Sequence, residues 1–175
     1  RTFERLPESN LTNNNSANNT VSKSFYSGET ASFKGYLRPN GKVGTRNYIG
    51  IISTVNCSAT VCKRIADNFK EDVLASYPNA DGVIALTHDS GCGMSIEGEG
   101  LALLQRVLIG YAEHPNFAGI LIVGLGCEVN QVSALIKKIE TNEEQQIRTL
   151  VIQENEGTRK TIENGVKIVE EFLEG

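Results

Sequence analysis

The sequence predicts an α/β fold with three layers, built on an open and mainly parallel sheet of about four or more strands, of the Rossmann or flavodoxin-like kind. Two observations predict it. From Asn47 onward, short apolar runs alternate with longer segments whose apolar residues recur at helical spacing. The short runs are nearly continuous, as expected of strands that are covered on both faces. Repeated β–α units favour parallel strands that are joined by right-handed crossovers.

Four strands are expected along the chain, at Tyr48–Val55, Gly82–Thr87, Gly119–Val123 and, as a shorter one, Leu150–Gln153. These segments are rich in β-branched residues, which favour strands. The sequence thus supplies enough strands for a single sheet.

A segment with helical spacing follows each expected strand. Its apolar positions are Val61, Cys62, Ile65 and Phe69 in the first helix, Leu101, Leu104, Leu108 and Tyr111 in the second, Val132, Leu135, Ile136 and Ile139 in the third, and Ile162, Val166, Val169 and Phe172 in the fourth. Ser58 or Asn56 is expected to cap the first helix, and Thr158 the last. Pro115 is expected to end the second helix.

The chain divides into two parts by composition. Residues 1–33 are rich in Asn and Ser and poor in apolar residues, so they are predicted to be a flexible linker. Residues 34–175 are predicted to form the α/β domain, which Pro39-Asn40-Gly41 opens with a turn.

Composition excludes several classes of function. The 175 residues are 39% hydrophobic and 22% charged, with a formal net charge of -4, as in a soluble globular protein. The acidic balance disfavours nucleic acid as a partner, and the apolar runs are too short to span a membrane. No signal peptide is recognisable, so we expect reduced thiols and a cytoplasmic location.

Three cysteines follow the ends of three expected strands. They are Cys57, Cys92 and Cys127. The carboxyl ends of parallel strands meet at one edge of a sheet, where open α/β sheets bind their ligands. We therefore predict that these thiols form a chemical centre and bind a metal. Cys62, in contrast, falls on an apolar helix face and is expected to pack in the core.

Two further residues at this edge are candidates for catalysis. His88 lies four positions before Cys92 in a glycine-rich loop, and imidazole and thiolate are both good ligands for iron or zinc. The structural alternative is that His88 caps a strand. Glu128 follows Cys127 and is expected in the first turn of the third helix, where it would serve the chemistry or only the helix dipole.

Thiols from separated loops favour a catalytic iron, as Fe²⁺ or an iron–sulfur cluster, over structural zinc, because the paired Cys-x-x-Cys knuckles of zinc sites do not occur. Another divalent metal is an alternative. Gly124-x-Gly126 suggests a non-catalytic module that binds a nucleotide or phosphate at the same edge, although the rest of the dinucleotide pattern is missing. A redox-sensing or structural-metal domain that acts through partner proteins is a third hypothesis.

Five segments carry a resemblance to a known family: Gly35–Asn47, Thr54–Cys57, Leu86–Gly93, His114–Phe117 and Val123–Gln131. With them the chain resembles the central domain of the altronate hydrolase/D-galactarate dehydratase family of sugar-acid hydro-lyases. The resemblance implies metal-assisted dehydration of an aldonate or aldarate to a 2-keto-3-deoxy acid. It also implies that Cys57, Cys92 and Cys127 bind the metal and that His88 and Glu128 are catalytic.

The resemblance also implies partners. Members of the family continue beyond the residue that matches Gly175 and often carry a small domain upstream, so this chain is expected to hold only part of the site. The expected partners are a small sugar acid and the missing N- and C-terminal domains of the same enzyme, and a homo-oligomer is compatible with the sequence. In the mechanistic hypothesis His88 removes the α-proton and the β-hydroxyl departs, with the metal stabilising the enediolate.

Overall fold

The computed structural model describes residues 2–3, 33–139 and 146–175, and the chain separates into two units, Arg1–Gly35 and Tyr36–Gly175. In the first unit, β1 (Thr2–Phe3) pairs antiparallel with β2 (Phe33–Lys34). The rest of the segment predicted to be a linker lies outside the described residues. The second unit contains the predicted α/β domain.

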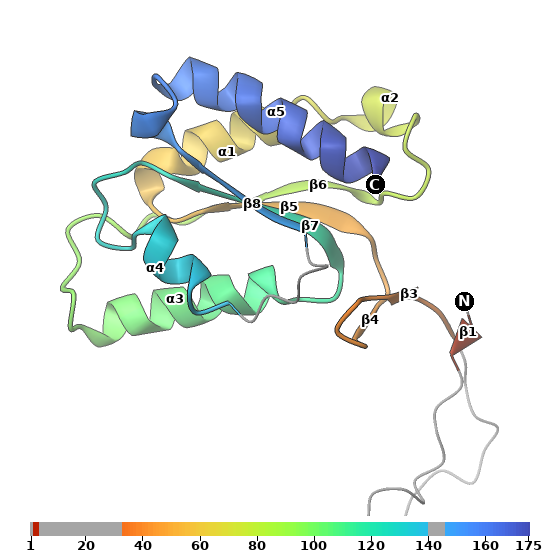
Figure 1. Ribbon diagram of the computed structural model, residues 1–175, viewed down its shortest axis with the longest axis horizontal. Helices are drawn as coiled ribbons and strands as arrows, with labels where there is room; N and C mark the ends of the chain where they lie inside the picture. Colours follow the sequence, from red (N-terminus) through yellow and green to blue (C-terminus); the bar gives the residue numbers. More distant parts are fainter. Residues whose placement is uncertain (1, 4–32, 140–145) are drawn as a thin grey trace, which may run out of the picture. The chain divides into compact units, whose positions relative to one another are not determined.

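Four parallel strands form the sheet of the second unit (Figure 1). They are β5 (Tyr48–Ser53), β6 (Gly82–Leu86), β7 (Phe117–Gly124) and β8 (Gln146–Val151). Their order is β6-β5-β7-β8, so the direction of progression through the sheet reverses between β5 and β7. The predicted fold class is confirmed, and the reversal marks the point where such sheets bind ligands.

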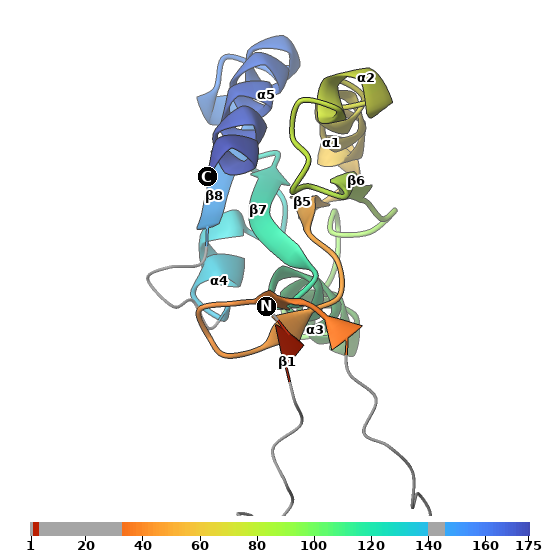
Figure 2. The ribbon, with the colours of Figure 1, turned by 90° about the vertical axis from the view of Figure 1, so that its right-hand side faces the viewer.

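Helices cover both faces of this sheet (Figures 1 and 2). One face carries α1 (Ala59–Ala66) and α5 (Thr158–Glu174), with the short α2 (Glu71–Leu74) in the same layer, and the other face carries α3 (Glu99–Ala112) and α4 (Val132–Ile136). No helix in the described part of the chain is long and apolar enough to cross a bilayer.

Alternating residues of the central strands build two cores. Ile49 and Ile51 of β5 pack with α1 and α5, whereas Ile52 packs with α3 and α4. In β7, Leu121 joins the first core and Ile122 joins the second. Burial on both faces explains why these strands are almost continuously apolar in sequence.

A hairpin at the amino-terminal edge of the sheet fixes the entrance to β5. It consists of β3 (Tyr36–Leu37) and β4 (Val43–Gly44), and Gly41 takes a φ of 78° in the predicted turn. The Arg38 guanidinium donates to the carbonyl of Pro115 at 2.6 Å and to the side chain of Asn47 at 2.8 Å. Burial lowers the pKa of Arg38 although Tyr36 acts in the opposite direction. The bond from Arg38 ties Asn47, at the entrance to β5, to the hairpin.

Several element ends differ from the predictions. β8 begins at Gln146, four residues before the predicted start, because its exposed first half lacks an apolar pattern. α4 is only five residues long and begins at Val132. Ser58 precedes α1 but makes no capping bond, since its hydroxyl donates to the carbonyls of Val55 and Val123.

Candidate functional site

The loops that leave β5, β6 and β7 all emerge at the carboxyl edge of the sheet, on the left in Figure 1. Cys57 lies in η2 (Asn56–Ser58) directly after β5. His88 and Cys92 lie in the loop after β6, and Cys127 lies in the loop after β7. The structure thus places the residues that were singled out from the sequence at one edge of one sheet.

The loops after β5 and β6 touch each other. The amide of Asn56 donates to the carbonyl of Ser90 at 2.8 Å. Gly91 is buried with a φ of 97°, and a Cβ there would lie 2.8 Å from the Cα of Val55. Only glycine permits this approach, because an added side chain would meet backbone atoms. The turn that carries Cys57 and the loop that carries Cys92 therefore form one surface.

The three thiols at this edge are exposed and free, whereas Cys62 is fully buried. Burial raises the pKa of Cys62 to about 12, which agrees with its predicted core role. The thiol of Cys57 lies 3.4 Å from Asn56 Oδ1, and the amide of Gln153 lies 3.5 Å from the sulfur of Cys127. Exposure leaves these sulfurs accessible to a ligand or to another protein surface.

The described residues do not form a complete metal site. Nowhere in the described ranges do three or more His, Cys, Asp or Glu side chains come together in a group that could hold a metal ion. The predicted ligands Cys57, Cys92 and Cys127 share an edge but not a coordination centre.

Glu128 lies in the loop between β7 and α4, not in the first turn of a helix as predicted. Its side chain is only 3% exposed. The carboxylate accepts hydrogen bonds from Thr54 Oγ1 at 2.7 Å and from the amides of Leu125 at 3.1 Å and Gly126 at 2.6 Å. These donors explain how a buried carboxylate is tolerated. The carboxylate fixes the loop that presents Cys127.

The arrangement around Glu128 also bears on the alternative of a phosphate site. A Cβ on Gly124 would overlap the Glu128 carboxylate, so the space opened by this glycine is already filled. The amides of Leu125 and Gly126, which a phosphate would need, already bind an internal anion. A second negative charge at this position is disfavoured.

Buried polar groups extend from Glu128 toward α3. Asn130 donates to the carbonyl of Thr54 at 3.0 Å, and Gln105 donates to Asn130 at 3.1 Å. Lys138 then donates to Gln105 at 2.6 Å. Sequence reasoning missed Thr54, Gln105 and Asn130 as site-forming residues. The one available signal was a polar residue inside an apolar pattern, as Gln105 is between Leu101 and Leu108.

Both ring nitrogens of His88 are engaged. The amide of Ser90 donates to Nδ1 at 3.1 Å, and Nε2 lies 3.0 Å from the carbonyl oxygen of Ser53. Because the amide can only donate, Nδ1 is the acceptor and the ring proton lies on Nε2. His88 must release the Ser90 amide before Nδ1 can take a proton from a substrate.

Comparison with known proteins finds a matching family model and several similar proteins. The family model described as "D-galactarate dehydratase/Altronate hydrolase, second domain" matches residues 35–175. Altronate dehydratase of Bacillus subtilis is 30% identical over 149 residues, which cover 85% of this chain and 29% of that protein.

Two further relatives match similar shares of the chain. Galactarate dehydratase (L-threo-forming) of Escherichia coli is 32% identical over 83% of this chain and 29% of that protein. The (2R)-sulfolactate sulfo-lyase subunit beta of Chromohalobacter salexigens is 29% identical over 81% of this chain and 32% of that protein. The chain thus spans about a third or less of the length of these relatives. No solved structure matches.

Proposed function

We propose that this chain, which belongs to the D-galactarate dehydratase/altronate hydrolase family as its second domain, supplies one wall of the active site of a sugar-acid dehydratase. One observation carries the proposal. In a chain of this family, the loops with Cys57, with His88 and Cys92, and with Cys127 emerge together where the strand order reverses. Ligands of open α/β sheets bind at such a place.

The substrate class follows from the chemistry that the relatives' names have in common. Altronate, galactarate and (2R)-sulfolactate are all 2-hydroxy carboxylates with a leaving group on carbon 3. We infer that the shared unit recognised by this family is the 2-hydroxy carboxylate. For this chain the leaving group is hydroxide in the favoured case, and the product is a 2-keto-3-deoxy acid.

In this proposal His88 takes the proton from carbon 2. The electrons of that C–H bond form a double bond between carbons 2 and 3, and the hydroxyl on carbon 3 leaves as water with a proton from solvent. His88 later returns its proton to solvent, so the step balances. The resulting enol becomes the 2-keto acid. His88 can act only when the bond from the Ser90 amide to Nδ1 is broken, so substrate binding must turn the His88 ring or move Ser90.

Iron stays a prediction at this site. Thiolates suit iron in either form, and the exposed sulfurs of Cys57, Cys92 and Cys127 face outward where further ligands can reach them. When bound, such a metal would stabilise the negative charge that develops on the substrate carboxylate. The described residues do not complete its ligand set, so any such site needs donors from elsewhere.

Glu128 has a different part in the proposal. Its hydrogen bonds to Thr54, Leu125 and Gly126 support a positioning role for the loop that carries Cys127. A direct role in proton transfer, as predicted from the sequence, would require the carboxylate to give up these bonds.

The test uses a protein of the relatives' full length that contains this chain. It is assayed with altronate, galactarate and (2R)-sulfolactate, and 2-keto acid and sulfite are measured as products. His88→Ala is expected to lower kcat by at least about 100-fold, the typical contribution of a general base.

His114→Ala is the matched control. His114 accepts a hydrogen bond from the backbone amide of Asn116, just as His88 accepts one from the amide of Ser90. His114, however, precedes β7 and lies at the opposite edge of the sheet. It is expected to keep normal turnover. Near-normal rates in His88→Ala would refute the role of His88, and sulfite release without dehydration would favour the sulfo-lyase alternative.

A further inference from the structure

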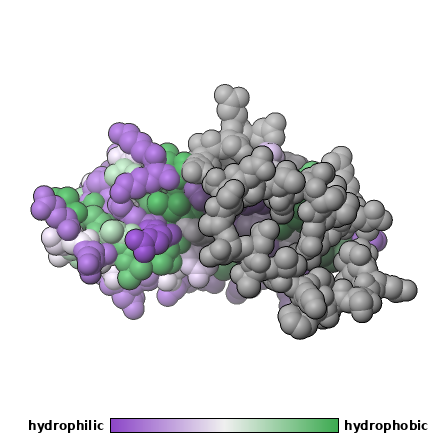
Figure 3. Space-filling model, turned by 90° about the horizontal axis from the view of Figure 1, so that it is seen from below, coloured by the Kyte–Doolittle hydropathy of each residue, from purple (hydrophilic) through white to green (hydrophobic). Residues whose placement is uncertain are grey.

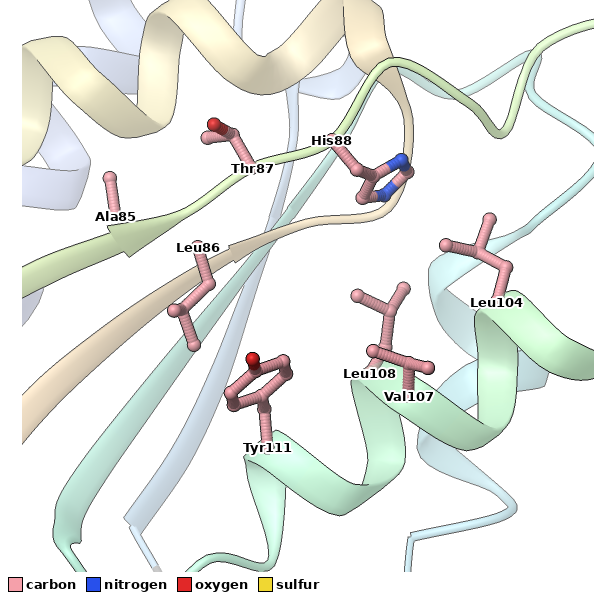
Figure 4. A pocket seen from close by; sticks show the side chains of 8 residues that line it. All are labelled: Ala85, Leu86, Thr87, His88, Leu104, Val107, Leu108 and Tyr111. Atoms are coloured by element: carbon pink, nitrogen blue, oxygen red, sulfur yellow. The ribbon is translucent and has the colours of Figure 1, made fainter.

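The face of the sheet beside α3 contains an apolar groove next to the candidate site. We call it the β6–α3 groove. It is a cavity of about 250 Å³ (Figure 4), lined by Ala85, Leu86, Thr87, His88, Leu104, Val107, Leu108 and Tyr111. Leu86 and His88 point toward α3, and Leu108 and Tyr111 point back toward the strand. The candidate base His88 therefore forms one wall of the groove.

Apolar side chains continue from the groove onto the surface. Leu103, Val107 and Tyr111 recur every four residues on α3 and are 57%, 46% and 46% exposed. Figure 3 shows hydrophobic side chains gathered among hydrophilic ones in the coloured part of this face. A surface helix normally turns its apolar stripe only toward the core. α3 has a second apolar stripe that is about half exposed, and such surfaces mark interaction sites.

The strand beside the groove is an unprotected sheet edge. β6 pairs with β5 and with no other described strand. None of its five residues, Gly-Val-Ile-Ala-Leu, is charged or a proline. Exposed edges of soluble proteins are usually blocked by charges, prolines or covering elements, because free backbone groups pair with other strands. β6 has neither a charge nor a proline, and it is only half-buried along Val83–Leu86.

We propose that an apolar, extended segment of the same protein, from a domain outside this chain, covers the β6–α3 groove and pairs with β6. The family model describes a second domain, and the chain spans about a third or less of the length of its relatives. Another domain of the same protein is therefore the occupant that we propose for the groove. Tethering on one polypeptide gives such a segment a high effective concentration. A strand added at an edge bonds through its backbone and fills the neighbouring pocket with its side chains.

The inference deepens the proposed function. It rests on that function only for the role of His88 as the base. A segment in the groove would lie against His88 and shield the carboxyl edge of the sheet from water. The active site would then be a cleft between two domains, with the thiol-bearing loops on one side.

Hydrogen–deuterium exchange on a protein of the relatives' full length tests the proposal without substrate. The amides within Val83–Leu86 that do not bond β5 are expected to be protected in the wild type. Val107→Glu places a charge in the groove and is expected to speed their exchange by at least about tenfold, the sign of a local opening. The amides of Ile120–Val123 in the central strand report that the domain stays folded.

Val73→Glu is the matched control, because Val73 is 37% exposed on α2 in the opposite layer. It is expected to leave β6 unchanged. Fast exchange of β6 in the wild type, or no effect of Val107→Glu, would overturn the proposal. Protection that disappears on hundredfold dilution would assign the groove to a second copy and overturn it too. Since exchange is measured apart from turnover, an inactive protein with a protected β6 would refute the proposed function and leave this inference standing.

Discussion

At the scale of single residues, the buried carboxylate of Glu128 determines the shape of the loop after β7. A charge that is 3% exposed needs strong partners, and Thr54 Oγ1 and two backbone amides provide them. Thr54 is 74 residues away in the sequence. The pair therefore fastens the exit of β5 to the exit of β7, and the two loops with Cys57 and Cys127 are held from within.

Glu128→Gln is expected to destabilise the protein by about 2 kcal/mol, because hydrogen bonds to a buried charge are lost and an amide NH₂ faces backbone donors. Urea unfolding measures this change. Alkylation by iodoacetamide, followed by peptide mass analysis, is expected to be faster at Cys127 and unchanged at Cys92.

Glu154→Gln removes a carboxylate that is exposed in the described structure and is the control for this experiment. Its unfolding midpoint and its alkylation rates are expected to match those of the wild type. Equal stability of Glu128→Gln and the wild type would contradict the anchoring role.

Sequence patterns predicted some residues of this site and not others. The position of a cysteine after an apolar run placed Cys57, Cys92 and Cys127 at the strand exits, and helical spacing placed Cys62 in the core. The environment of Glu128 was not predictable in this way. It depends on a contact with Thr54 across the sheet, and periodicity along the chain carries no information about such contacts.

At the scale of elements, the packing of α5 against α1 depends on a helix position without a side chain. A Cβ at Gly165 would overlap Ile65 Cδ1 and lie 3.0 Å from Ile65 Cγ1, and Ile65 is fully buried. The glycine lowers helix propensity but permits the close approach of the two helices.

Gly165→Ala is expected to destabilise the protein by about 1 kcal/mol, because overpacking, which typically costs about 1–3 kcal/mol, exceeds the gain of up to about 1 kcal/mol in helix propensity. Gly110→Ala in α3 isolates the propensity gain, since nothing lies within 4 Å of its added Cβ. It is expected to stabilise by about 0.5–1 kcal/mol. Thermal unfolding of both variants checks the opposite signs, and equal shifts would contradict the packing argument.

The existence of the strands and helices was predictable, whereas their arrangement was not. Apolar runs and helical spacing indicate whether each segment forms a strand or a helix, so β5, β6 and β7 lie near their predicted limits. The order β6-β5-β7-β8 depends on which strands pair, and that is a property of the whole sheet. For the same reason the sequence placed Tyr111 on a core face, although it borders the open β6–α3 groove.

At the scale of the whole molecule, the carboxyl edge presents three exposed thiols but no complete set of metal ligands among the described residues. We expect the 175-residue chain, purified without oxygen, to hold less than stoichiometric iron, because the described residues form no group of three ligands. A protein of the relatives' full length is expected to hold more. Iron and acid-labile sulfide are measured after desalting.

Two cysteine variants of the full-length protein distinguish the role of an exposed thiol at the sheet edge from that of a buried thiol in the core. Cys92→Ala is expected to lose the metal, whereas Cys62→Ala, which removes a buried thiol, is expected to keep it. Full iron retention in Cys92→Ala would contradict a ligand role for that thiol.

The strand order also determines when each strand can pair during synthesis on the ribosome. β5 lies between β6 and β7, and the bond from Thr54 to Val123 joins residues 69 positions apart. At roughly 5–20 residues per second, about 3 to 14 seconds separate the appearance of these two residues. During that interval β5 has β6 as its neighbour but lacks the strand that buries its other side. The backbone edge of β5 that faces β7 therefore stays unpaired until β7 has been synthesised.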